Sequence, residues 1–484
     1  MQNTTGTDAA LPLPRARSGS ARPLSARIAV SRPHVELRAA VGLIALALLI
    51  AGTVTIVLVA SAGPTPLVPR SSISFPAWVA GPLHGLLAPI TAPNETISDW
   101  FSVLAVAMLL VYGVVLVCVR AVGTRVVIGS VLVLHAVLLF SPPLQLEDVF
   151  NYLGYARLGA LHGLNPYTHV MAQASLDPVY LLTTWHHLQS PYGPLFTAAT
   201  YPLALLPLPV AYWVLKVATV LGSLGLLALC WRCARALGRD PRTVVAFVAL
   251  NPIYLIWALG GFHNDVFMID AALASVVLVL RRRDRAAGGA LAVAIAIKFT
   301  AVLLLPFLLL AITPARRRVR LLSGLGLAAI PLIVLSTALF GFALPNLSTQ
   351  SSLLTAYSVP NLLGDAIGAG GGAPWLLHLA DAAVVLLVVW LVARRRDWLS
   401  GAGWATLALL LSLAWLVPWY LLWLLPLAAL ARSARLRAAA LAMTVFLVIS
   451  FVPWTGLVLS EHGVRTLTGS AGAASLQREA SLQK

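Results

Sequence analysis

The chain alternates between long uncharged apolar runs and short clusters of arginine, proline and glycine. The apolar runs recur from residue 39 to residue 456, and most approach the roughly 20 residues that an α-helix needs to cross a bilayer. The pattern predicts an all-α fold, a polytopic transmembrane helical bundle of about eleven spans. The expected crossings are residues 39–61, 101–119, 126–141, 210–231, 243–260, 265–280, 321–343, 375–393 and 438–456, with two more in 401–430.

Three apolar stretches do not fit single crossings. Residues 195–206 are too few to span a bilayer, so we expect a re-entrant or half helix there. Residues 286–313 have arginine clusters at both ends, which predicts two short helices that meet near Lys298. Residues 401–430 are also flanked by arginines, and a tight hairpin is expected to turn at residues 417–420.

The ends of the chain differ from this body. Residues 1–38 combine six arginines with proline, serine and glycine, which predicts a disordered cytoplasmic tail. Residues 39–456 form the predicted transmembrane domain, and residues 457–484 form a second tail. Arginine clusters mark the cytoplasmic side, so the long polar stretch at residues 142–193 is expected on the outer face. Loops of this length usually carry function.

Composition supports the membrane assignment and excludes two other classes of protein. Of the 484 residues, 60% are hydrophobic and 10% are charged, whereas soluble domains carry about 25% charged residues. The net charge of +17 arises from arginines between apolar runs, so no nucleic-acid partner is expected. The three cysteines lie in or beside apolar runs and indicate neither a disulfide framework nor a zinc site.

The first candidate site is the adjacent pair Glu147 and Asp148 at the outer boundary of the third crossing. Helical spacing would place Asp148, Tyr152 and Tyr155 on one face of an amphipathic helix that lies on the membrane surface. A carboxylate held there could act as a general base toward a substrate hydroxyl, while its neighbour tunes it. The alternative is a negatively charged helix start that satisfies free backbone N–H groups.

The second candidate site is the string G-G-F-H-N-D at residues 260–265. The two glycines permit a close turn, after which His263, Asn264 and Asp265 begin the next helix. Asn264 or Asp265 can be a simple N-cap, but three consecutive polar groups at a membrane boundary exceed what capping requires and indicate binding. No second histidine lies at ligand spacing, so we predict no cofactor and no metal site, and leave a divalent cation open.

The third candidate site is the string S-P-Y-G-P-L-F at residues 190–196, which forms a rigid turn. Tyr192 in this turn, and His186 and His187 before it, are placed to line a substrate site. Lys298 is the only charge inside the apolar run at residues 286–313, and a charge there costs free energy unless it is ion-paired or hydrated. Its simplest explanation is snorkelling at a helix break.

Five strings in register resemble the GT-C superfamily of polytopic glycosyltransferases. They are E-D-V-F-N-Y with G-L-N-P-Y (147–152, 163–167), P-Y-G-P-L-F (191–196), L-N-P-I-Y-L with G-G-F-H-N-D (250–255, 260–265), A-I-K-F-T-A-V-L-L-L-P (296–306) and P-W-Y-L-L-W-L-L-P (418–426). The match covers roughly residues 100–430. It is nearest to the actinobacterial polyprenyl-phosphomannose-dependent alpha-(1→6)-mannosyltransferases, which build the mannan cores of lipoglycans.

The resemblance implies an inverting glycosyltransferase in the plasma membrane, with its active site on the extracytoplasmic face. It would transfer a sugar, with mannose implied, from a polyprenyl-phosphate donor to a glycan or lipoglycan acceptor, in contact with membrane lipid. By position, the catalytic aspartate of the family is Asp148, although Glu147 stands where the family commonly has a small residue. The phosphate of the donor would lie near Arg157, His186 or His187.

A transporter or flippase of lipid-linked sugars is the competing interpretation. It predicts paired broken helices at the bilayer midplane and charged residues deep in the bundle. The polar clusters of this chain fall at the predicted outer boundary, which favours the enzyme.

Overall fold

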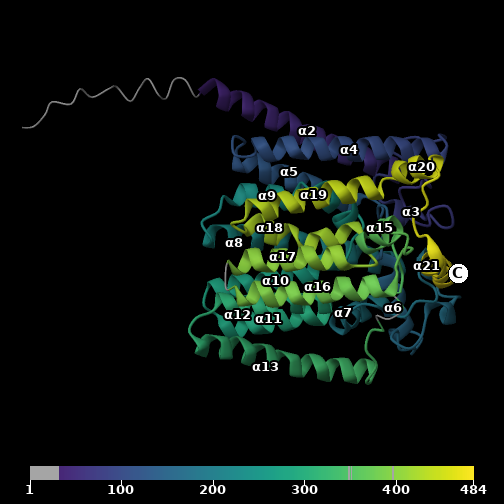
Figure 1. The fold of residues 1–484 in the computed structure, drawn as a ribbon. Helices are drawn as coiled ribbons and strands as arrows, with labels where there is room; N and C mark the ends of the chain where they lie inside the picture. The colour runs from purple at the N-terminus through teal and green to yellow at the C-terminus, as the bar shows by residue number, and fades with distance from the viewer. Residues whose placement is uncertain (1–31, 347–348, 350–351, 395–396) are drawn as a thin grey trace, which may run out of the picture.

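The computed structural model describes residues 32–346, 349, 352–394 and 397–484, and all regular structure in these ranges is helical (Figure 1). Most helices lie side by side along one common direction. One end of the bundle carries arginine-rich turns such as residues 281–283, and we call it the arginine end. The opposite end carries α6 (Val149–Ala160) and α21 (Gly469–Gln483), and we call it the site end.

Six helices in the described ranges are long and apolar enough to cross a membrane, or up to seven if the bent pair α9 and η3 counts as one span. The six are α2 (Arg32–Ala62), α4 (Asn94–Cys118), α8 (Leu208–Ala236), α13 (Ala315–Phe340), α16 (Pro374–Ala393) and α19 (Ala434–Phe451). The predicted all-α membrane fold is therefore confirmed. The predicted count of about eleven spans is not confirmed, because several expected crossings are helices shorter than a bilayer requires.

The other described elements are shorter. They are α3 (Ala77–Ala80), α5 (Thr124–Phe140), η1 (Met171–Ala174), η2 (Tyr180–Leu182), α10 (Asp265–Leu280), α15 (Val359–Ala366), α20 (Pro453–Glu461) and the segments named below. The crossing expected at residues 243–260 is bent by 57° between α9 (Pro241–Ala249) and η3 (Ile253–Leu259).

The three stretches expected to be irregular are broken as the sequence indicates. Residues 195–206 contain the short helix α7 (Pro194–Ala204). The chain breaks at Lys298, which has an extended backbone between α11 (Asp284–Ile297) and η4 (Phe299–Leu304), and continues into α12 (Leu305–Ala311). The third stretch breaks between α17 (Trp398–Ser412) and η5 (Pro418–Trp423), which leads into α18 (Leu425–Leu430).

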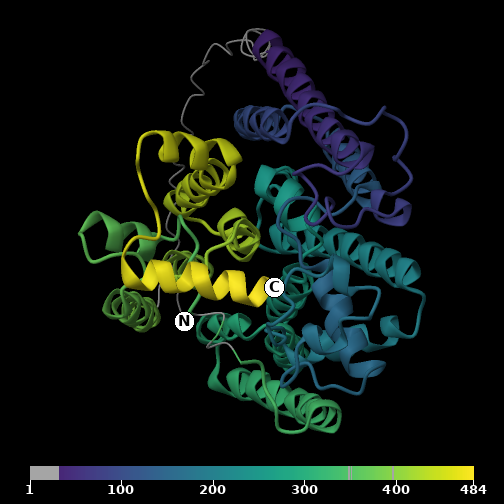
Figure 2. The same ribbon diagram turned by 90° about the vertical axis from the view of Figure 1, so that its right-hand side faces the viewer.

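The two ends of the chain are more helical than expected. Residues 32–38 belong to α2 rather than to a tail, while residues 1–31 of the predicted tail lie outside the described residues. The predicted second tail contains the last residues of α20 and all of α21. Figure 2 shows α21 lying across the site end, transverse to the neighbouring helices. This helix is anchored where Leu354 N–H donates to Ser475 Oγ (2.8 Å) and His187 N–H donates to the Leu482 carbonyl oxygen (2.9 Å).

Close packing of α11 against α13 fixes part of the arginine end. A Cβ atom added at Gly288 would overlap the Leu321 carbonyl oxygen, and one added at Gly324 would overlap the Arg285 carbonyl oxygen. Small residues at such contacts let two backbones approach closely, as is common between membrane helices. α11 therefore has a fixed position, and its opposite end at Lys298 is positioned with it.

Candidate active site

The segment that precedes α6 joins two of the predicted motifs. Leu144 N–H donates to the Gly260 carbonyl oxygen (2.9 Å), and His263 Nε2 lies 2.9 Å from the Leu146 carbonyl oxygen. Asp148 lies at the N-cap position of α6, yet its side chain makes no capping hydrogen bond. Helix capping therefore does not account for Asp148.

α6 forms where the sequence predicts a helix, but its surroundings differ from the prediction. Every residue from Val149 to Leu158 except Arg157 is buried, and the helix packs against α7, α8 and η1. The prediction of an amphipathic helix on the membrane surface is wrong. The loop at residues 161–193 contacts the helix, because Leu188, Thr184 and Asp177 of the loop form hydrogen bonds with side chains of α6.

A cavity of about 460 Å³ lies beside the carboxylate pair, and we call it the carboxylate cavity. Its polar lining includes Glu147, Asp148, Tyr192, Lys298, Glu479 and Gln483. Its aromatic lining includes Trp185, Tyr357, Trp415, Trp419 and Tyr420. A concave site with aromatic walls and a few convergent polar groups is typical of small-molecule binding.

The turn at Pro191–Pro194 is held against the break at Lys298. Gly193 N–H donates to the Ile297 carbonyl oxygen (3.1 Å), and a Cβ atom at this position would overlap that backbone. The ring of Tyr192 packs edge-on against Tyr152, with 4.7 Å between ring centroids, and lines the carboxylate cavity. The predicted rigid turn thus brings two motifs together.

The three consecutive residues of the second motif contact different parts of the site. They are His263, Asn264 and Asp265. His263 Nδ1 lies 3.4 Å from Asp148 Oδ2, and its ring stacks on Trp419 at 3.7 Å between centroids. Asn264 N–H donates to Tyr152 Oη at 3.0 Å. All three side chains are almost fully buried and do not line the cavity. They support the cavity wall from behind, whereas the sequence suggested direct contact with substrate.

Asp265 anchors Lys298 at the wall. Lys298 Nζ lies 2.8 Å from Asp265 Oδ1, and Trp423 Nε1 donates to the same oxygen at 2.5 Å. The ammonium also lies 4.4 Å from the ring centroid of Tyr420 and 4.9 Å from that of Trp423. Lys298 is therefore a paired and oriented cation at the site, which contradicts the snorkelling explanation.

A second cavity of about 640 Å³ adjoins the first, and we call it the lysine cavity. The two cavities share Pro191, Lys298, Leu354, Trp415 and Tyr420. The lysine cavity is also lined by His378 and Asp381 from α16 and by Arg478 from α21. Thus α21 contributes polar groups to both cavities, although the sequence indicated only a tail.

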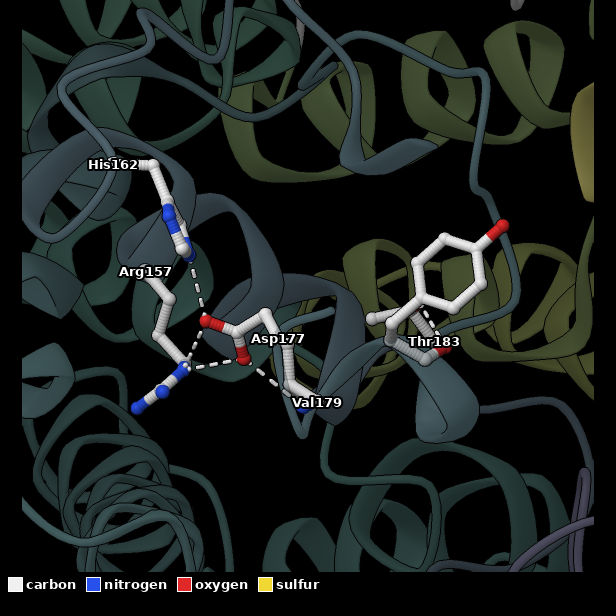
Figure 3. A network of polar contacts seen from close by, with 6 residues as sticks. Arg157, His162, Asp177, Val179 and Thr183 are labelled. Atoms are coloured by element: carbon white, nitrogen blue, oxygen red, sulfur yellow. Dashed lines mark hydrogen bonds and ion pairs between the residues drawn. The ribbon is translucent and has the colours of Figure 1, made fainter. Parts of the chain in front are cut away.

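Arg157 does not reach either cavity. Its Nε donates to both oxygens of Asp177 (2.8 and 3.0 Å), and the same carboxylate contacts His162 Nε2 at 2.8 Å and accepts from Val179 N–H at 3.0 Å (Figure 3). Arg157 is absent from the lining of both cavities. Its expected role as a phosphate ligand gains no support from this geometry.

Three other residues that the sequence predicted to bind substrate also lie outside the lining of both cavities. His186 is buried, stacks on Tyr180 at 3.9 Å between centroids and contacts the Tyr180 carbonyl oxygen through Nε2 (3.0 Å). His187 is exposed outside the cavities and is held by α21 through its backbone. Tyr155 Oη donates to the Leu188 carbonyl oxygen (2.8 Å), so Tyr155 positions the loop.

The pKa values of two carboxyl groups outside the helical spans, Glu147 and Asp177, are shifted in opposite directions. Burial raises the pKa of Glu147 to about 8, and repulsion from Asp148 adds to this, against the opposing effect of the Phe150 and Val149 N–H groups. Burial alone would also raise the pKa of Asp177, but hydrogen bonds from Arg157, Val179 and His162 lower it overall. Glu147 therefore carries a proton at neutral pH, while Asp177 does not. Among the described residues, no group of three or more His, Cys, Asp or Glu side chains could hold a metal ion.

Two protein-family models match segments of this chain. The model described as alpha-(1→6)-mannopyranosyltransferase, N-terminal domain, matches residues 40–314, and the MptB C-terminal domain model matches residues 375–475. Alpha-(1→6)-mannopyranosyltransferase A of Mycobacterium tuberculosis is 29% identical over 402 residues, which cover 70% of this chain and 74% of that protein.

Two further relatives share shorter segments. The protein of the same name from Corynebacterium glutamicum is 30% identical over 184 residues, which cover 35% of each chain. A probable alpha-(1→6)-mannopyranosyltransferase of Mycolicibacterium smegmatis is 27% identical over 63% of this chain and 65% of its own length. No solved structure matches the chain significantly. Since the first family model covers more than half of the sequence, the chain belongs to the alpha-(1→6)-mannopyranosyltransferase family and is a membrane glycosyltransferase of the GT-C type.

Proposed function

We propose that the protein transfers a mannosyl residue from a polyprenyl-phosphate donor to a glycan or lipoglycan acceptor. The main support is Asp148, whose carboxylate lines the carboxylate cavity, makes no capping bond and lies beside His263. A carboxylate with this access is suited to accept the proton of an acceptor hydroxyl. The names of the relatives support mannose as the transferred sugar. The membrane-spanning helices support a donor that is linked to a lipid.

The proposed reaction inverts the anomeric centre. The acceptor oxygen forms a bond to the anomeric carbon while the bond from that carbon to the phosphate oxygen breaks. The proton of the acceptor hydroxyl passes to Asp148, and polyprenyl phosphate leaves with the bonding electron pair. Glu147, protonated at neutral pH, can donate a hydrogen bond within the same cavity but cannot serve as a base in that form.

The test is transfer of label from radiolabelled polyprenyl-phosphomannose to a short α-mannoside, with membranes that contain the protein. We expect a new α-linked product that is missing from membranes with Asp148→Asn. GDP-mannose without polyprenyl phosphate serves as the donor control and should give no product in purified protein. A protein that moves the labelled lipid between leaflets without forming a glycosidic bond would contradict the proposal and support the flippase.

We also propose that the site end faces the extracytoplasmic side of the plasma membrane. The arginine clusters lie at the other end of the bundle, as the positive-inside rule expects of the cytoplasmic side. Cysteine at Leu176, which is 98% exposed at the site end, should react with an impermeant reagent in intact cells. Cysteine at Ala286, exposed at the arginine end, should react only after permeabilisation, and the three native cysteines are buried. The reverse pattern would contradict the orientation.

A further inference from the structure

We propose that the lysine cavity is the donor subsite, in which Lys298 and Arg478 bind the phosphate of the lipid-linked sugar, and that the carboxylate cavity takes the acceptor. This inference rests on the proposed function, because it assigns the two substrates to two adjoining spaces. It also replaces Arg157, which the geometry commits to Asp177. Four observations carry it.

The first observation is that Lys298 has capacity for another ligand. An ammonium group has three N–H donors, and the described contacts of Lys298 include one hydrogen bond, to Asp265. Its side chain is 21% exposed and lines both cavities. The contacts with Asp265, Tyr420 and Trp423 fix the ammonium in position without enclosing it.

The second observation is the difference in charged groups between the two cavities. Besides the shared Lys298, the carboxylate cavity is lined by Asp148, Glu479 and the neutral carboxyl group of Glu147, so that space suits the hydroxyl groups of a sugar acceptor better than a phosphate. Besides Lys298, the lysine cavity is lined by one arginine, Arg478, and one carboxylate, Asp381. An anion is therefore better accommodated in the lysine cavity.

The third observation is that two helices begin at the lysine cavity. Gly193 lines it one residue before α7, which begins at Pro194, and Gly372 lines it two residues before α16, which begins at Pro374. The dipole of each helix makes such an end favourable for anions. These helix ends add to the effect of the cationic side chains, which point to the same space.

The fourth observation concerns access from lipid. α16 forms one wall of the lysine cavity, and none of its residues is buried, so most of this helix is available to lipid. A prenyl chain can therefore remain in the bilayer while its phosphate enters beside α16. Of the two cavities, Asp148 lines only the carboxylate cavity, which places the base and the leaving group on opposite sides of the residues that both cavities share, as inversion requires.

The test compares binding of farnesyl phosphate and farnesol to purified protein in nanodiscs. These probes differ only in the phosphate, so their affinity ratio reports the subsite directly. We expect wild-type protein to prefer farnesyl phosphate. The double variant Lys298→Met with Asp265→Asn removes both buried charges together and so avoids leaving an unpaired carboxylate. It should lose about 10- to 100-fold in affinity for farnesyl phosphate, with farnesol unchanged.

Arg478→Ala gives a second variant that leaves the core intact, because Arg478 is exposed and forms no ion pair with the described residues. It should lose about 3- to 10-fold for farnesyl phosphate alone. Arg465→Ala is the matched control, since Arg465 is exposed at the same end but lines neither cavity. Wild-type protein without preference, or an unchanged ratio in Arg478→Ala, would overturn the subsite.

This outcome is independent of the transfer assay. Phosphate-dependent binding that Arg478→Ala weakens, in a protein that transfers no mannose, would support the subsite and contradict the proposed function. Transfer of mannose with unchanged phosphate preference in both variants would support the function and contradict the subsite.

Discussion

Asp177 and Asp265 are both buried aspartates held by a cation at 2.8 Å, but they differ in how completely they are bonded. Both oxygens of Asp177 are occupied, by Arg157, His162 and the Val179 N–H group. Asp265 Oδ1 accepts from Lys298 and Trp423, whereas Asp265 Oδ2 has no partner among the described residues. Both carboxylate oxygens of Asp177 therefore have hydrogen-bond partners, whereas only one oxygen of Asp265 has partners among the described residues.

The difference separates a structural ion pair from a functional one. The Asp177 cluster joins α6 to the loop at residues 161–193 and lines neither cavity. The Asp265 cluster presents Lys298 to both cavities. Lys298 keeps free N–H donors beside open space, so a ligand that enters the cavities can complete its bonding.

Asp148→Asn should give the largest loss of activity. General-base catalysis contributes about 100- to 10,000-fold in rate, and asparagine cannot take the acceptor proton. The amide keeps the size of the carboxylate, so we expect donor binding to remain. Mannosyl transfer and farnesyl phosphate binding, measured on the same preparation, test both points. Turnover above about a tenth of the wild-type value would assign the base elsewhere.

Asp265→Asn should come next, with at least about a tenfold loss of turnover. The variant keeps a hydrogen-bond acceptor for Trp423 but removes the charge that orients Lys298. We expect weaker binding of farnesyl phosphate because the ammonium is no longer fixed. If Asp265 were only a helix cap, activity and binding would stay near wild type at normal abundance in the membrane.

Asp177→Asn should show the opposite behaviour, a loss of stability with little loss of activity. The change weakens contacts to Arg157 and His162, and disruption of such a cluster costs about 1–3 kcal/mol. Thermal unfolding in detergent should therefore occur at lower temperature. Turnover of the protein that remains folded should stay within about twofold of wild type. A large loss of turnover in folded protein would show that the loop at residues 161–193 takes part in the reaction.

The sequence predicted the breaks and the motifs better than it predicted their surroundings. Arginines at both ends of a run were sufficient to place the break at Lys298, because charge fixes the sidedness of a membrane segment. The sequence could not show that Asp177, 20 residues after Arg157, takes up that guanidinium. Nor could it show that Asp265 and Lys298, separated by 33 positions, would pair across α10 and α11.

Two site elements left a weak signal in the sequence. Trp419 and Tyr420 fall in the predicted hairpin turn at residues 417–420, and in the structure both line the carboxylate cavity. α21 has a polar, serine- and alanine-rich sequence without an apolar period, so it resembled a tail. Its position depends on long-range contacts with Leu354 and His187, which no local pattern encodes.

Glu147→Gln should have the smallest effect at neutral pH. Because burial raises the pKa of Glu147 to about 8, its carboxyl group is already neutral at pH 7, and glutamine replaces it with a neutral group of similar size. We expect turnover within about threefold of wild type at this pH. A dead Glu147→Gln variant alongside an active Asp148→Asn variant would reverse the assigned roles.

The same substitution should change how stability depends on pH. The folded protein keeps the proton of Glu147 up to about pH 8, whereas the unfolded chain releases it near its ordinary pKa of 4.5. The folded state binds more protons across this window, so this carboxyl group lowers the stability of the wild-type protein as pH rises through it. Glutamine has no proton to release, so the unfolding temperature of Glu147→Gln relative to wild type should increase from pH 5 to pH 9. A difference between the two proteins that stays constant over this range would mean that Glu147 is ionised in the folded state.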